Sequence, residues 1–186
     1  MVEQMYKLLI VGDSFAANTL GWPNFFDNFD VTNLSTNGSS EYRIFKKLQA
    51  TDLNIYNRII IVHTSANRIY VDHNPIHLNS PTHQQCDLIY NDVANNNSEF
   101  AQHVTWWFEN IFDIEQAELM HSCLIDKIQQ ITYNIPTIHL TFFDYNYQNV
   151  ENLHRLWKKY PGDINHLSTK GNQEVAKIIK QRLSDA

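Results

Sequence analysis

The chain has 186 residues, a formal net charge of -6 at pH 7, and a hydrophobic content of 43%. A chain of this length can bury about 70% of the surface that its unfolded form exposes, so we expect one domain, residues 1–186, rather than a disordered protein. The acidic balance, with no basic run longer than Lys158-Lys159, argues against nucleic acid as a partner.

The sequence also carries no sign of a membrane or of an oxidising compartment. We see neither a signal peptide nor an apolar stretch long enough to span a bilayer, so we expect no membrane partner. The two cysteines, Cys86 and Cys123, form no CxxC pair. We therefore expect a cytoplasmic protein with free thiols, although one disulfide stays open.

Four apolar segments along the chain predict strands. The first and third are continuous apolar runs typical of strands buried on both faces of a parallel sheet. The four segments are Tyr6–Val11, Phe29–Leu34, Arg58–Val62 and Ile135–Phe143. Helices are predicted between and after them, over Ser39–Gln49, over Glu99–Thr132 as one helix or two, and over Thr169–Leu183.

Strands that alternate with helices indicate a parallel sheet covered by helices on both sides. We therefore predict an α/β protein, a three-layer α/β/α sandwich around a parallel sheet of about five strands, in the SGNH/flavodoxin-like class. The segment Thr64–Ser98 has the least regular pattern. Its length favours either a functional insertion or short helices that the pattern does not reveal.

Polar residues that could take part in catalysis follow the predicted strands. Gly12-Asp13-Ser14 comes directly after the first strand, and Gly38 and Asn67 follow the second and third strands. Ligands of open parallel sheets bind at the carboxyl ends of the strands, so these residues should meet at one edge. A serine hydroxyl is a nucleophile, and a glycine N–H and an asparagine amide are donors suited to an oxyanion.

A carboxylate and an imidazole precede the last predicted helix, as Asp163 and His166. A carboxylate three residues before a histidine can hold the ring through Nδ1–H and leave Nε2 free to take the proton of a serine. Each of these groups alone is also typical of an ordinary capped turn. Their joint occurrence in one chain favours a catalytic interpretation.

This order of residues resembles the SGNH (GDSL-like) hydrolases, from Gly12 to the C-terminal helix. The resemblance implies that Ser14 is the nucleophile, His166 the general base and Asp163 the residue that orients it. It also implies an oxyanion hole formed by the N–H groups of Ser14 and Gly38 and the side chain of Asn67. The third block departs from the family's Gly-x-Asn-Asp, because it reads Ser65-Ala66-Asn67-Arg68.

The resemblance implies a carboxylic ester hydrolase that uses an acyl-enzyme and needs no cofactor or metal. The expected partner is a small-molecule or carbohydrate ester, and the family includes O-acetylesterases that act on carbohydrates. An acyltransferase with the same triad is an alternative, because the acyl group can pass to an acceptor other than water. A catalytically silent binding or assembly module with this fold is another. The sequence gives no indication of the oligomeric state.

Further polar and aromatic residues are candidates for contact with the substrate. They are Asp13, Arg68, Tyr70, His73 and Tyr145, which lie next to the predicted catalytic turns. A group of potential metal ligands, His73, His77, His83, Cys86 and Asp87, lies in the same region, but its spacing matches no standard zinc pattern. In the adjacent pair Trp106-Trp107, we expect Trp107 in the core and only Trp106 at the surface.

Overall fold

The structure of the protein is a computed structural model, and it describes residues 5–77, 85–163 and 166–185. Five parallel strands form a central sheet in the order β2-β1-β3-β6-β7. In chain order they are β1 (Tyr6–Gly12), β2 (Phe29–Asn33), β3 (Arg58–His63), β6 (Thr137–Thr141) and β7 (Glu151–Asn152). The four predicted strands are therefore confirmed, and β7 is the fifth.

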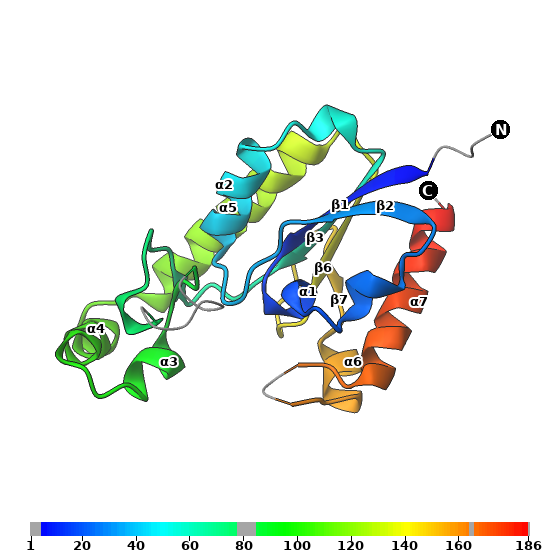
Figure 1. Ribbon diagram of the computed structural model, residues 1–186. Helices are drawn as coiled ribbons and strands as arrows, with labels where there is room; N and C mark the ends of the chain where they lie inside the picture. Colours follow the sequence, from blue (N-terminus) through cyan, green and yellow to red (C-terminus); the bar gives the residue numbers. More distant parts are fainter. Residues whose placement is uncertain (1–4, 78–84, 164–165, 186) are drawn as a thin grey trace.

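Helices cover both faces of this sheet, which gives the expected three-layer α/β/α sandwich (Figure 1). One face carries α2 (Glu41–Gln49) and α5 (Ile114–Thr132), which lie side by side. The other face carries α1 (Ser14–Ala17), the 3-10 turn η1 (Trp22–Phe25), α6 (His154–Lys159) and α7 (Thr169–Asp185). A further 3-10 turn, η2 (Leu53–Ile55), precedes β3.

Alternate residues of the strands build two separate cores, as the two-residue repeat of a strand requires. Leu9 and Ile61 belong to the cluster under α2 and α5. Leu8 and Val62 belong to the larger cluster under α1, α6 and α7. Both faces are buried from Leu8 to Gly12 in β1 and from Ile59 to His63 in β3, which explains why these stretches show continuous apolar runs rather than alternation.

The segment predicted as one helix or two over residues 99–132 is two helices, α4 (Glu99–Asn110) and α5. The break occurs because Asp113 caps α5, where its carboxylate accepts the N–H groups of Glu115 and Gln116 at 2.9 and 3.1 Å. With α3 (Tyr90–Ala94), α4 forms a lobe that projects from the sheet beside the start of α5 (Figure 1). Trp107 packs inside this lobe, while Trp106 is 57% exposed, as expected.

The irregular segment of residues 64–98 holds short elements rather than one long loop. It includes an antiparallel pair, β4 (Arg68–Ile69) with β5 (Leu88–Ile89), the 3-10 turn η3 (Pro75–His77) and α3. Its apolar side chains pack against α4 in a third cluster. Among the residues that the structure describes, no helix is long and apolar enough to cross a membrane.

Candidate active site

Ser14 lies at the carboxyl end of β1, as the first residue of α1, and its side chain is half-buried. The turn is tight, because a Cβ added at Gly12 would lie 2.7 Å from Cβ of Val62 on the neighbouring strand. Asp13 caps the short helix, and its carboxylate accepts the N–H of Phe15 at 3.0 Å. The sequence therefore fixes the serine at the edge of the sheet where parallel-sheet sites form.

Asp13 lies beneath this turn, and it is fully buried. Oδ2 of Asp13 is 3.1 Å from Nη1 of Arg68 and accepts the hydroxyl of Thr64 at 3.3 Å. Burial raises the pKa of Asp13, while Arg68 and the two hydrogen bonds oppose the shift. We expected Asp13 to contact the substrate, but a fully buried carboxylate already engaged by protein donors supports the serine turn from below instead.

The side chain of Arg68 connects several of the predicted turns. Its Nη1 also donates to the carbonyl oxygen of Ser39 at 3.0 Å, and its guanidinium lies 5.2 Å from the centre of the Phe143 ring. Only 9% of the side chain is exposed. Arg68 thus holds together the turns that follow β1, β2 and β3, and its hydrogen-bonding capacity is largely used within the protein rather than offered to a ligand.

Gly38 follows β2 and has a φ of +63°, a conformation that residues other than glycine seldom adopt. A side chain there would also meet Cys86, whose Cβ would lie 2.9 Å from an added Cβ. The carbonyl oxygen of Gly38 accepts the N–H of Asp87 at 3.1 Å. Its own N–H donates no hydrogen bond to any described residue, so it stays available as an oxyanion donor.

Asn67 follows β3 and has an exposed side chain. Its Oδ1 accepts the hydroxyl of Ser65 at 2.6 Å, and the oxygen of this hydroxyl lies 3.3 Å from the hydroxyl of Tyr145. The hydrogen bond from Ser65 fixes the amide by its oxygen. The side-chain N–H groups on Nδ2 are then available among the described residues, and these are the donors that can stabilise an oxyanion.

His166 lies close to the serine turn in space, although the two are far apart in the sequence. The centre of its ring lies 5.8 Å from that of Phe15, and the imidazole is close enough to Asp13 to oppose the rise in the pKa of that carboxyl. Asp163 is exposed, and its backbone carbonyl accepts the N–H of His166 at 3.1 Å. Nδ1 of His166 is buried without a hydrogen-bond partner among the described residues, so the carboxylate of Asp163 does not hold the ring in the expected way.

The other expected contact residues lie in three different environments. Tyr70 has its ring 4.9 Å below the guanidinium of Arg43, and its hydroxyl accepts from Lys46 at 2.7 Å and donates to Asp72. Tyr145 lies beside Ser65, close to the third turn. His73 is exposed and forms no hydrogen bond with another described residue.

The potential metal ligands do not form a cluster within the described residues, where no group of three or more suitable side chains is found. Asp87 is instead buried and paired with Arg43, with Oδ1 2.6 Å from Nη2, and Oδ2 accepts the N–H of Ser40 at 2.6 Å. Burial raises the pKa of the Cys86 thiol to about 11, which keeps it protonated. His83 lies outside the described residues.

A buried chain of polar side chains that the sequence did not reveal runs through the α2/α5 face. Oε1 of Glu41 accepts from Nδ1 of His63 at 2.7 Å, and Oε2 lies 3.3 Å from Nε2 of His121. Although burial opposes it, the two imidazoles hold the pKa of Glu41 below its usual range. Nδ1 of His121 is 2.8 Å from the hydroxyl of Tyr147.

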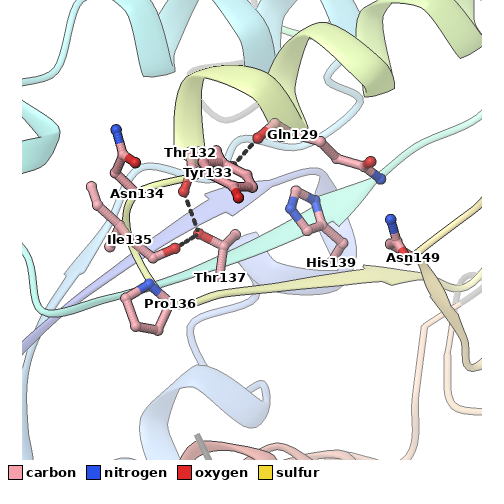
Figure 2. Close-up of a pocket in the computed structure, with 9 residues that line it drawn as sticks. All are labelled: Gln129, Thr132, Tyr133, Asn134, Ile135, Pro136, Thr137, His139 and Asn149. Atoms are coloured by element: carbon pink, nitrogen blue, oxygen red, sulfur yellow. Dashed lines mark hydrogen bonds between the residues drawn. The ribbon is translucent and has the colours of Figure 1, made fainter.

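At its other end, this chain reaches a pocket beside the start of β6. Nε2 of His63 is 2.9 Å from Nδ1 of His139, whose ring points into the pocket (Figure 2). Thr137, which also lines the pocket, donates to the carbonyl of Ile135 at 2.8 Å (Figure 2). It lies away from the carboxyl edge of the sheet, so it is separate from the serine site. The repeat Ile59-Ile61-His63 on one strand face was the sequence signal for a buried histidine.

Comparisons with known proteins give distant structural likenesses only. No protein-family model matches the chain, and no curated protein matches it. The chain is similar to a GDSL-like lipase from Bacteroides thetaiotaomicron, with a TM-score of 0.45 and 15% identity over 96% of this chain and 88% of that one. It is also similar to a member of the lipolytic protein G-D-S-L family from Veillonella parvula, with a TM-score of 0.39 and 13% identity over 92% and 94% of the two chains.

Proposed function

We propose that the protein is a serine hydrolase of the SGNH (GDSL-like) type, which cleaves a carboxylic ester through an acyl-enzyme. The observation that supports this most is the meeting of four distant turns. Arg68 binds both Asp13 and the carbonyl of Ser39, and the ring of His166 packs on Phe15. These contacts support the proposal that the hydroxyl, the imidazole and the donors of an oxyanion hole meet at one edge of the sheet.

In the proposed reaction, Nε2 of His166 takes the proton of Ser14 as its oxygen attacks the ester carbonyl. The negative charge on the tetrahedral intermediate is stabilised by the N–H groups of Ser14 and Gly38 and by Nδ2 of Asn67. The intermediate collapses, and the alcohol leaves with the proton from His166. Water, deprotonated by the same imidazole, then releases the acid and restores the hydroxyl of Ser14.

We still assign Asp163 the role of orienting His166, because both residues lie in the same turn. The N–H of His166 donates to the backbone carbonyl of Asp163 at 3.1 Å. Its exposed carboxylate must approach Nδ1 of His166 during the reaction, when the ring becomes positive. A carboxylate recruited in this way contributes less than the nucleophile or the base. We expect Asp163→Asn to lower kcat by a smaller factor than Ser14→Ala or His166→Ala.

The test is covalent labelling by a fluorophosphonate, which reacts only with an activated serine. We expect the wild-type chain to be labelled, Ser14→Ala to remain unlabelled, and Ser168→Ala, which changes a serine that caps the backbone N–H of Gly171, to be labelled as the wild type is. Hydrolysis of p-nitrophenyl esters by the same variants gives a second readout. A wild-type chain that stays unlabelled between about pH 6 and 9 would support the silent-module alternative instead.

An acyltransferase would use the same residues, so labelling does not separate it from a hydrolase. Product analysis does, because an acyltransferase passes the acyl group to an added alcohol or sugar in preference to water. The resemblance in sequence leaves an acetyl ester of a carbohydrate as one candidate substrate, which the dependence of kcat/KM on acyl length tests. The turns around Ser14 do not select an acyl length, so that selection depends on the space beside them.

A further inference from the structure

We infer that an apolar cavity beside the Asn67 turn holds the acyl group of the substrate, and that this group is a medium-length aliphatic acyl chain rather than acetyl. The inference rests on the proposed hydrolase function. The cavity has a volume of about 530 Å³ and lies between the start of α2, the turn after β3, and the helices α4 and α5. Its apolar wall is formed mainly by Ile69, Trp107, Ile111, Phe112, Met120 and Leu124.

The cavity is lined by residues that neighbour a proposed oxyanion donor in the chain. Ala66 and Arg68, which flank Asn67 in the chain, both line it. Arg68 also reaches Asp13, the residue before Ser14, at 3.1 Å. An acyl group attached to Ser14 with its carbonyl oxygen at Asn67 therefore has the cavity next to it.

The position of His166 decides which part of the ester enters the cavity. The leaving alcohol takes its proton from His166, so the alcohol must lie on the side of that ring. His166 contacts Phe15 and precedes α7, whereas the cavity belongs to α2, α4 and α5. Figure 1 shows α4 and α5 on one side of α1, and α6 and α7 on the other. The acyl part then points toward the cavity.

Two charged side chains of the cavity wall, Glu41 and Arg68, are already engaged by the protein. Oε1 of Glu41 accepts from His63, and Oε2 accepts the N–H of Thr64 at 3.1 Å. Arg68 binds Asp13 and the carbonyl of Ser39. Because these two charged groups have partners, they need no polar group on the ligand, and the wall that remains to be covered is mainly apolar.

The cavity is much larger than an acetyl group needs. At about 30 Å³ for a water-sized group, 530 Å³ has room for roughly seventeen such groups, and the methyl of an acetyl ester occupies one. Ile111 and Met120, which line the cavity, are 56% and 58% exposed. A longer aliphatic chain would cover these side chains, and each methylene it buries would raise kcat/KM by about fourfold.

The experiment measures kcat/KM for p-nitrophenyl acetate, butyrate, hexanoate and octanoate with the full chain. We expect octanoate to exceed acetate by about tenfold or more, which requires burial of at least about two of its six additional methylenes. Met120→Trp should lower the octanoate-to-acetate ratio by about tenfold, because the larger ring lies across the cavity. Leu119→Trp is the matched control, since Leu119 is the neighbour of Met120 on α5, is 65% exposed and does not line the cavity. It should keep the wild-type ratio.

The outcomes separate the two proposals. If Ser14 reacts with a fluorophosphonate but acetate is cleaved as well as octanoate, or if both tryptophan variants behave alike, the acyl cavity is wrong and the hydrolase remains. If Ser14 does not react and no ester is cleaved, both proposals fall. We expect both tryptophan variants to keep the wild-type unfolding midpoint, because both side chains are at the surface. Measured midpoints then exclude loss of folding as the cause of a changed octanoate-to-acetate ratio.

Discussion

Nη1 of Arg68 lies 3.1 Å from Oδ2 of Asp13, and this contact joins the turn after β3 to the residue before Ser14. Both side chains are buried, with 9% and 0% of their surface exposed. An ion pair of this kind is worth little relative to an apolar pair of the same shape. Loss of one partner is costly, however, because it leaves the other as an unpaired charge in the interior.

We therefore predict that Arg68→Met lowers the free energy of unfolding at pH 7 by about 3 to 5 kcal/mol. Urea unfolding followed by tryptophan fluorescence measures the change. Arg182→Met is the control, because Arg182 pairs with Glu151 at 3.4 Å in an exposed position. That change should cost less than about 1 kcal/mol. Equal losses in the two variants would contradict a special role for the buried pair.

The Gly38 turn gives a second prediction. Gly38→Ala places a side chain where φ is +63° and where the new Cβ lies 2.9 Å from Cβ of Cys86. We expect a loss of about 1 to 3 kcal/mol in stability, together with lower kcat as the oxyanion donor shifts. The preceding residue, Asn37, is not in the left-handed region. Asn37→Ala should leave both quantities close to the wild type, and the same loss in both variants would refute the explanation.

Asn67 and Ser65 should affect catalysis to different degrees. Asn67→Ala removes a donor to the oxyanion, and we expect kcat to fall by about 100- to 1000-fold. Ser65→Ala removes the 2.6 Å hydrogen bond that fixes the amide but keeps the donor. We expect a loss of about tenfold in kcat with little change in KM, since Ser65 acts by positioning Asn67.

Steady-state kinetics with one ester measure both changes. Ser35→Ala is a suitable control, because the hydroxyl of Ser35 has no hydrogen-bond partner among the described residues. If Ser65→Ala raised KM and left kcat unchanged, Ser65 would contact the substrate rather than position Asn67.

The partly buried imidazole of His139 predicts how stability changes with pH. Burial, with a further contribution from His63, lowers the pKa of His139 to about 3. An imidazole in the unfolded chain titrates near about pH 6.5. Between these two values the unfolded chain binds a proton that the folded protein does not. The stability that is complete above about pH 6.5 is therefore lost progressively as the pH falls toward 3.

Between about pH 7 and pH 5, this effect should lower the free energy of unfolding by about 1 to 2 kcal/mol. Urea unfolding at the two pH values measures it. His139→Gln should reduce the pH dependence, and the exposed His103 on α4 provides the control His103→Gln, which should not. A pH dependence unchanged by His139→Gln would show that another group is responsible.

The predicted strands and the blocks that follow them agree with the structure because their signals are local. Continuous apolar runs over β1 and β3 follow from burial on both faces, and the residues after each run come to the carboxyl edge of the sheet. The places of Ser14, Gly38 and Asn67 could be predicted for this reason. By contrast, α6 carries no buried residue and β7 has only two residues, so neither leaves a clear pattern.

The role of Arg68 could not be read from the sequence, which suggested a contact with substrate. A guanidinium after β3 can turn outward or inward, and only the neighbouring strands bring the carboxylate of Asp13 and the carbonyl of Ser39 within its reach. The same holds for Glu41, which joins His63 on β3 and His121 on α5. Contacts between distant segments have no local signal in the chain.

The sequence by itself determined the alternation of strands and helices and the order of the candidate catalytic residues, because periodic burial and turn chemistry act between neighbours along the chain. Only the tertiary structure decided which polar groups are buried together, how the ring of His166 lies relative to Asp163, and where an apolar cavity opens beside Asn67. These depend on the packing of α2, α4 and α5 against the sheet, and packing is a property of surfaces that meet only after the chain has folded.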